Sequence, residues 1–131
     1  MKGADVRYMR IYHTENAPAA VGPYSQAIEA NGVLYCSGQI AIDPKEGKIV
    51  ASGIEAQAEQ CCKNVEAVLK EAGLSMERVV RTTCFLAEIA DFAAFNGVYA
   101  RHFVSKPARS CVAAKALPAG ALCEIEVTAV R

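Results

Sequence analysis

Apolar side chains recur at three- and four-residue steps between residues 54 and 72, a spacing that places them on one face of an α-helix. The members of this stripe are Ile54, Ala58, Cys61, Val65, Val68, Leu69 and Ala72. An aromatic stripe predicts a second helix over residues 92–103, and its members are Phe92, Phe95, Tyr99 and Phe103. Each predicted helix therefore needs an apolar surface to pack against.

Polar residues and glycine predict where these helices begin and end. Ser52 and Glu55 match the capping-box pattern, so the first helix is expected to begin after Ser52. Gly73 fits the position just past its end. Asp91 is the expected N-cap of the second helix.

Short segments between turn residues predict the strands of a sheet. Residues 26–30 and 33–39 flank Asn31-Gly32, a dipeptide typical of a two-residue type I′ hairpin turn. Residues 79–86 are rich in β-branched side chains and follow the first helix, which predicts a parallel, right-handed crossover. Residues 110–116 and 122–130 are the last two strands, and the turn between them is interpreted as closing a hairpin.

These elements predict a single α+β domain over residues 1–131, with a six-stranded mixed sheet and two helices on one face. Residues 1–12 are either an edge strand of that sheet or an N-terminal extension. In the last strand the apolar residues at odd positions should face the helices, while Glu124 and Glu126 point to the other face. Because that face mixes acidic and apolar side chains, we expect another copy of the protein to cover it.

The charge balance argues against a nucleic-acid partner. Lysine plus arginine equals aspartate plus glutamate at 14 each, so the formal net charge is zero. Nucleic-acid binders usually carry a basic excess, because phosphate neutralisation supplies most of their affinity. Hydrophobic residues make up 53% of the chain, which is enough for a packed core and, at zero net charge, favours self-association.

The six cysteines follow no metal or disulfide pattern. They stand at positions 36, 61, 62, 84, 111 and 123, without a Cys-x-x-Cys spacing and mostly where a small apolar residue would serve. We expect buried, reduced thiols, with Cys61 rather than Cys62 facing the core. The sequence contains no signal-peptide pattern and no apolar run near ~18 residues, so a cytoplasmic protein with no membrane partner is expected.

Arg109 and Glu124 are the first candidate for chemistry. Arg109 follows Pro107 at the start of a strand, and the predicted hairpin would place it beside the strand that carries Glu124. Arginine binds carboxylates through paired hydrogen bonds, and a nearby glutamate can accept a proton. The arginine would keep Glu124 ionised. The alternative is a plain ion pair between strands that serves stability alone.

Two further positions are candidates for a pocket. Tyr24 follows Gly22-Pro23 in a proline-rich loop, where its hydroxyl reaches a pocket rim or its ring simply packs. Asn96-Gly97 places two poor helix formers inside the second helix. Such an irregularity is tolerated where function requires it, although a helix can also simply contain these residues.

Seven collinear motifs resemble the RidA/YjgF family, the reactive-intermediate imine and enamine deaminases. They extend over roughly residues 14–130. The motifs are Ala17-Pro18, Gly22-Pro23-Tyr24-Ser25-Gln26-Ala27, Ser37-Gly38-Gln39-Ile40, Gln57 with Asn64, Asp91-Phe92-Ala93 with Asn96 and Tyr99, Pro107-Ala108-Arg109-Ser110-Cys111-Val112, and Leu117-Pro118 followed by Glu124-Ile125-Glu126. The chain departs from the family at Ala41, where proline is frequent, and in a short connection over residues 104–106, which leaves substrate preference open.

The resemblance implies a chorismate-mutase-like trimeric barrel, in which three sheets pack face to face and three pockets lie between subunits. It implies hydrolysis of 2-aminoacrylate, 2-iminopropanoate and related enamines or imines to 2-keto acids and ammonia. No cofactor or metal is implied. The expected partners are these small imino and enamine carboxylic acids and the other copies of the chain.

The resemblance also assigns the site residues. Arg109 matches the arginine that grips the substrate carboxylate, and Glu124 matches the glutamate that orients and activates the attacking water. Cys111 matches a pocket residue beside the substrate nitrogen, and Tyr24 would close the pocket from a neighbouring subunit. These four are the catalytic candidates. The expected substrate-binding residues that line or brace the pocket are Ser37, Gly38 and Asn96.

Two other functions remain open at this level. One is a non-catalytic protein that binds small carboxylates in the same pocket for regulation. The other is a ribonuclease or translation inhibitor. The neutral charge and the presence of only two histidines, His13 and His102, disfavour RNA cleavage.

Overall fold

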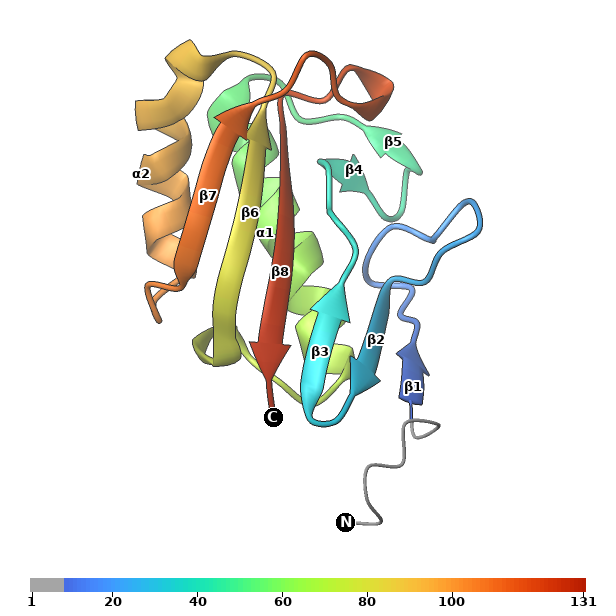
Figure 1. The fold of residues 1–131 in the computed structure, drawn as a ribbon. Coiled ribbons are helices and arrows are strands. Elements are labelled where there is room, and N and C mark those ends of the chain that lie inside the picture. The colour runs from blue at the N-terminus through green and yellow to red at the C-terminus, as the bar shows by residue number, and fades with distance from the viewer. Residues whose placement is uncertain (1–8) are drawn as a thin grey trace.

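The computed structural model describes residues 9–131, and these form one six-stranded sheet with two helices over one face (Figure 1). The strand order is β1-β2-β3-β8-β6-β7, with a small separate sheet of β4 and β5. The predicted α+β architecture is therefore confirmed. The expectation of an edge strand or extension over residues 1–12 is answered only from residue 9 on, because residues 1–8 lie outside the described part.

The N-terminal half of the sheet is an antiparallel meander of β1 (Met9–Tyr12), β2 (Ala27–Ala30) and β3 (Val33–Cys36). Asn31 and Gly32 join β2 to β3 with φ angles of 52° and 81°. Positive φ at both positions is the requirement of the type I′ turn that the sequence predicted. The short strands β4 (Ile42–Asp43) and β5 (Lys48–Ile49) then pair with each other beside the main sheet.

Helix α1 (Ile54–Glu71) begins one residue later than predicted. Its N-cap is Gly53, at a φ of 87°, and no side-chain cap occurs there in the described chain. The predicted capping box at Ser52 is therefore wrong, because the chain enters the helix through a left-handed residue that glycine adopts at little cost. Gly73, at a φ of 75°, follows the helix end as expected.

The apolar stripe of α1 packs on β8, and α2 covers a second side of the helix. Cys61 and Cys62 are both fully buried. The prediction that only Cys61 faces the core is wrong, since a helix covered on two sides buries more than one stripe. All six cysteines are free thiols, and all but Cys111 are buried, as the sequence predicted.

The C-terminal half of the sheet consists of β6 (Val79–Leu86), β7 (Ala108–Ala113) and β8 (Cys123–Val130), with α2 (Phe92–His102) between β6 and β7. Strand β6 pairs with β7 in parallel and with β8 in antiparallel orientation. Because β8 is also antiparallel to β3, strands β3 and β6 run parallel, as the predicted crossover requires.

Strand β6 lies between β7 and β8 (Figure 1), so the predicted hairpin of the last two strands is wrong. The reason lies in the composition of β8. Its residues at odd positions, Cys123, Ile125, Val127 and Ala129, are all buried against the helices. A strand with one wholly apolar face is most stable in the centre of the sheet, whereas β7, which has only exposed and half-buried residues, lies at the edge.

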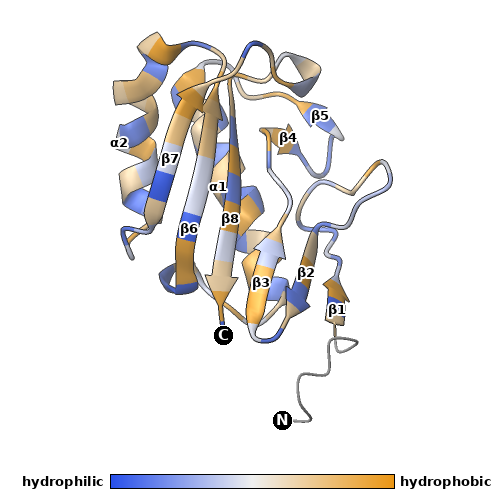
Figure 2. Ribbon diagram, viewed as in Figure 1, coloured by the Kyte–Doolittle hydropathy of each residue, from blue (hydrophilic) through white to orange (hydrophobic). Residues whose placement is uncertain are grey.

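Hydrophobic and hydrophilic residues are interleaved along β6, β7 and β8 (Figure 2). On β8 the helix-facing residues are buried, while Glu124 and Thr128 are half-buried and Glu126 is exposed on the other face. Val112 of β7 is also 48% exposed. The face away from the helices is therefore the mixed polar and apolar surface that the sequence predicted.

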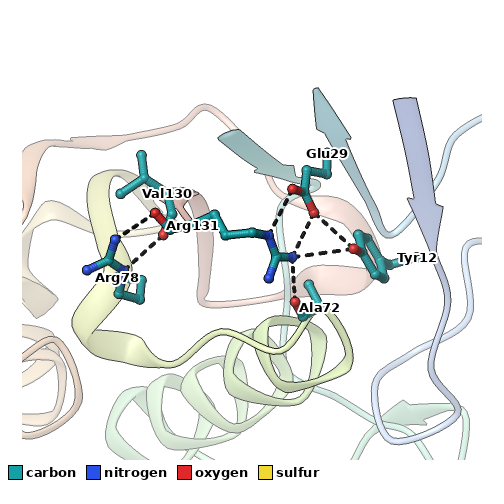
Figure 3. A network of polar contacts seen from close by, with 6 residues as sticks. All are labelled: Tyr12, Glu29, Ala72, Arg78, Val130 and Arg131. Carbon is teal, nitrogen blue, oxygen red and sulfur yellow. Dashed lines mark hydrogen bonds and ion pairs between the residues drawn. The ribbon is translucent and has the colours of Figure 1, made fainter. Parts of the chain in front are cut away.

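Arg131 ties the end of the sheet to its neighbours (Figure 3). Its guanidinium donates to both carboxylate oxygens of Glu29, at 2.9 and 2.7 Å, and to the carbonyl of Ala72 at 2.6 Å. The Tyr12 hydroxyl donates to the same carboxylate at 2.9 Å. Arg131 thus links β8, β2 and the end of α1. Within residues 9–131, neither helix combines the length and apolarity needed to cross a membrane.

Candidate functional site

Strand β7 places Arg109 at the sheet edge, against one face of α2. Nη1 of Arg109 donates to Oδ1 of Asn96 at 2.8 Å. The guanidinium carbon lies 4.6 Å from the ring centroid of Tyr99 and 5.6 Å from that of Phe92. Phe92, Asn96 and Tyr99 follow one another at four- and three-residue steps, so a single helix face supplies all three contacts. The Asn96 expected to brace the site therefore does contact Arg109.

Cys111 lies two residues beyond Arg109 on β7 and projects to the same face. It pairs with the fully buried Cys84 of β6 and is itself half-buried against the core. Burial raises the pKa of the Cys111 thiol above its ordinary value of 9.0, although the charge of Arg109 acts in the opposite direction. Because the thiolate is the nucleophilic form, this cysteine suits a pocket wall better than a nucleophile. We call Arg109, Asn96 and Cys111 the arginine group.

Glu124 lies on β8, on the face away from the helices, and its carboxylate rests over Gly38. A Cβ atom at position 38 would collide with that carboxylate, so only glycine leaves room for it. Gln39 and Ile125 beside them exchange two backbone hydrogen bonds of 2.8 and 3.0 Å, which hold the two segments together. The role that the structure shows for Gly38 is therefore to leave space for the Glu124 carboxylate. Its expected contact with substrate stays a prediction.

Burial raises the pKa of the Glu124 carboxyl, and the nearby charge of Glu126 raises it further. Arg109 is not among the groups that shift this pKa within the described chain, so the expectation that Arg109 would keep Glu124 ionised stays a prediction. A carboxylate with a raised pKa is a stronger proton acceptor, which suits a general base working near neutral pH. The direction of the shift supports the chemical role that the sequence suggested, by a different physical route.

Ser37 joins the Tyr24 loop to the Gly38 segment. Its hydroxyl donates to the carbonyl of Ser25 at 2.6 Å, and its backbone N–H donates to the carbonyl of Gln26 at 2.9 Å. Tyr24 adjoins Ser25, and its side chain is 52% exposed. The Ser37 hydroxyl therefore braces the loop. We call Tyr24, Ser37, Gly38 and Glu124 the glutamate group.

The two groups do not meet within one chain. Arg109 pairs with Thr82, and Thr82 pairs with Val127, which is buried beneath the helices. Side chains of paired residues project to the same face, so Arg109 points to the helix-covered side. Glu124 precedes Val127 by an odd number of residues and therefore points to the opposite side. The direct Arg109–Glu124 neighbourhood predicted from the hairpin is thus absent from the described chain.

Three buried polar residues hold the segments around the glutamate group, and the sequence patterns assigned them no role. Gln57 accepts from the N–H of Leu122 at 2.9 Å, next to the start of β8. Asn64 donates to the carbonyls of Ile40 and Ile42 at 3.1 and 2.9 Å. Gln26 binds the backbone of the preceding loop. Gln57 and Asn64 lie among the buried apolar residues of α1, and a buried amide there is the signal that could have identified them, because such a group requires partners.

Within residues 9–131, no cluster of three histidine, cysteine, aspartate or glutamate side chains could hold a metal ion. Every buried side-chain nitrogen and oxygen in that part of the chain has a hydrogen-bond partner.

Comparisons with known proteins agree on one family. A family model described as Endoribonuclease L-PSP matches residues 14–131. A protein of Lactococcus lactis named as a proposed regulator, AldR, is 50% identical over 122 residues, which cover 92% of this chain and 97% of that protein. The human 2-iminobutanoate/2-iminopropanoate deaminase is 43% identical over 123 residues, covering 93% of this chain and 90% of that protein.

Solved structures give the same result. The crystal structure of YyfA from Yersinia pestis, described as a protein of unknown function of the conserved Rid protein family, matches with a TM-score of 0.91 at 48% sequence identity. The match covers 94% of this chain and 99% of that one. At this identity and coverage the arrangement of the sheet and both helices is shared along the whole matched length.

Proposed function

This chain belongs to the RidA/YjgF family, and from that premise we propose that it is a hydrolytic deaminase of 2-imino and enamine carboxylic acids. The substrates are 2-iminopropanoate, its enamine 2-aminoacrylate, and 2-iminobutanoate. The products are 2-keto acids and ammonia. The observation that carries the proposal is Arg109, whose charge is held at the sheet edge with only one acceptor, Asn96, among residues 9–131. Its remaining N–H groups are available to a substrate carboxylate.

The chemistry needs little beyond positioning and proton transfer. Arg109 binds the carboxylate, which places C2 of the protonated imine opposite Glu124. Glu124 accepts a proton from water as the oxygen bonds to C2, and it returns that proton to the amine nitrogen. Loss of ammonia with transfer of the hydroxyl proton through Glu124 leaves the 2-keto acid. A protonated imine is already electrophilic, so holding the reactants in place contributes much of the acceleration.

A complete site requires more than one chain, because the arginine group and the glutamate group lie on opposite faces of the sheet. We therefore propose a homotrimer in a chorismate-mutase-like barrel, with a pocket at each interface. Each pocket combines Arg109, Asn96 and Cys111 of one copy with Glu124 and Tyr24 of the next. The mixed open sheet face and the 52% exposed Tyr24 side chain support this arrangement, since both offer surface for a neighbouring copy.

The direct test is Arg109→Ala, with Arg101→Ala as the matched control. Arg101 lies on the outer side of α2, where its side chain is 65% exposed. The imine is generated in the assay by an amino-acid oxidase, and formation of 2-keto acid is followed against buffer alone. We expect Arg109→Ala to fold and assemble but to lose turnover by roughly a hundredfold or more, because the carboxylate contact is lost. Full turnover with Arg109→Ala would reject the assigned role.

A non-catalytic carboxylate-binding protein is the second candidate, which the name of the AldR relative favours. Titration with 2-oxobutanoate beside the turnover assay separates the two. Binding without acceleration of imine hydrolysis would support the second candidate. A ribonuclease receives less support from the geometry, because the partly buried His102 links α2 to α1, with Nε2 2.9 Å from Oε1 of Glu59. Degradation of RNA by metal-free protein, lost in Arg109→Ala, would restore it.

A further inference from the structure

We propose that Tyr99 is the positioning residue for Arg109, and that the buried hydroxyl of Thr82 holds Tyr99 in place. The inference rests on the proposed function, in which Arg109 binds the substrate carboxylate. It adds Tyr99, which the sequence analysis placed in an apolar stripe and in a family motif without giving it a role in the site. Three sets of contacts support it: those that hold Tyr99, those that Tyr99 makes with Arg109, and the pairing of Thr82 with Arg109 in the sheet.

Tyr99 is held at both ends of its side chain. Its hydroxyl lies 2.7 Å from Oγ1 of Thr82, and Thr82 is fully buried. Its ring stacks on Phe103 with 4.3 Å between centroids and 23° between planes. Phe95 contacts the ring from another side, at 5.8 Å between centroids. An aromatic side chain with its polar tip bound and its ring stacked has little freedom to rotate.

Arg109 in turn rests on this fixed ring. Its guanidinium carbon lies 4.6 Å from the Tyr99 centroid, closer than the 5.6 Å to Phe92. Stacking on an aromatic face stabilises a guanidinium and limits its rotation, while the N–H edges remain free to donate. With Nη1 bound to Asn96, the ring and the amide together define the plane of the guanidinium. A carboxylate then meets a donor edge of set direction.

The sheet also connects Thr82 directly to Arg109. Thr82 is the residue paired with Arg109 in the parallel register of β6 and β7. The hydroxyl that holds Tyr99 and the backbone that carries Arg109 therefore belong to neighbouring positions of one ladder. Because the backbone of Arg109 is fixed by the sheet, a shift of the Tyr99 ring would move only the guanidinium of Arg109. Tyr99 thus sets the orientation of the Arg109 guanidinium, whereas a residue that only fills the core would not.

The experiment measures binding of 2-oxobutanoate by calorimetry and turnover of the imine, for Tyr99→Leu, Tyr99→Phe and Thr82→Val. Tyr99→Leu removes the stacked ring, and we expect both the Kd for 2-oxobutanoate and the KM to rise about tenfold. Tyr99→Phe and Thr82→Val break the same hydrogen bond, and each should raise Kd by roughly threefold. Their double variant should show no larger loss than either single variant, because one interaction is shared.

Val98→Ala is the matched control, since Val98 is a buried residue of the same helix and has neither a ring nor a polar group to hold Arg109. It should lower the melting temperature and leave Kd unchanged. If it raises Kd as much as Tyr99→Leu does, general loosening of α2 explains the effect and the inference is overturned. If Tyr99→Leu does not fold, Tyr99→Phe and Thr82→Val decide, and wild-type affinity in both overturns it.

Arg109→Ala separates this inference from the function on which it rests. If Arg109→Ala loses 2-oxobutanoate binding while the Tyr99 and Thr82 variants keep wild-type Kd and KM, the positioning role is wrong and the proposed function stands. If Arg109→Ala itself binds 2-oxobutanoate with wild-type affinity, the assigned carboxylate contact fails, whatever the Tyr99 variants do. If Arg109→Ala loses 2-oxobutanoate binding, and Tyr99→Leu weakens that binding more than Tyr99→Phe does, the result supports both the proposed function and the positioning role.

Discussion

Gly38 illustrates how a single missing side chain can set the geometry of a site. The Glu124 carboxylate lies where the Cβ atom of any other residue at position 38 would be. Its half-buried location there raises the pKa of the carboxyl, with a further contribution from Glu126. The requirement for glycine is one of clearance rather than of backbone conformation, because Gly38 is not among the glycines with positive φ.

We predict that Gly38→Ala displaces the Glu124 carboxylate and lowers kcat by roughly tenfold to a hundredfold, since a small misplacement of a catalytic group is costly. Steady-state kinetics with 2-iminobutanoate measure the effect. Gly97→Ala is the control, because a Cβ atom at this helical position meets no atom within 4 Å. That change should stabilise α2 by about 0.5–1 kcal/mol and leave kcat unchanged. Equal kinetics in both variants would contradict the clearance argument.

At the scale of elements, buried amides hold the loops on which the site depends. Gln26 accepts from the N–H of Thr14 at 2.7 Å and donates to the carbonyls of Thr14 and Pro18 at 3.0 and 2.8 Å. It lies two residues after Tyr24 and is 3% exposed. One amide therefore fixes the loop before β2 to the strand that follows it. The buried backbone N–H and C=O groups of this loop need hydrogen-bond partners, and the Gln26 amide supplies them.

Replacement of this amide should loosen the loop without emptying the core. We predict that Gln26→Met lowers the free energy of unfolding by roughly 2–4 kcal/mol, because several buried backbone groups lose their partner. KM should rise as well, since the loop carries Tyr24. Chemical denaturation and kinetics provide the two measurements. Gln60→Met, which removes one 2.9 Å hydrogen bond to Asn64, should cost about 1 kcal/mol and leave KM unchanged.

At the scale of the whole molecule, the sheet separates the two halves of the candidate site. The helices cover one face and complete the arginine group, while the other face presents Glu124 beside exposed apolar residues. Arg131 closes the opposite end of the sheet through Glu29, whose pKa its hydrogen bond lowers. Hydrogen bonds therefore link the elements at that end of the sheet, whereas the face away from the helices remains uncovered in one chain and is the face that a neighbouring copy would cover.

This separation predicts complementation between two inactive variants. Arg109→Ala keeps the glutamate group, and Glu124→Gln keeps the arginine group. When equal amounts are unfolded, mixed and refolded together, a trimer with interfacial sites should recover about a quarter of wild-type turnover, because each site needs one donor of each kind. Light scattering should give three times the 13.9 kDa mass of one chain. No recovery from a properly assembled mixture would mean that the site forms within one chain.

Much of this molecule can be predicted from local patterns. The Asn31-Gly32 turn, the apolar stripe of α1, the strand Val79–Leu86 and the inward face of β8 all appear as expected, because each depends on residues close in sequence. Burial of most cysteines also agrees with the pattern. The start of α1 at Ile54 differs by one residue, since a left-handed Gly53 competes with Ser52 as the cap.

The candidate site divides in the same way. Sequence determined that an arginine at a strand mouth, a glutamate on an alternating strand and an asparagine within a helix were the residues to test. Tertiary structure decided how they meet: β6 takes the place beside β7, Arg109 turns toward Asn96 and Tyr99, and Glu124 turns to the opposite face. The physical reason is range. Helix and strand periodicity arise from neighbouring residues, whereas strand order depends on which distant apolar faces bury most surface together.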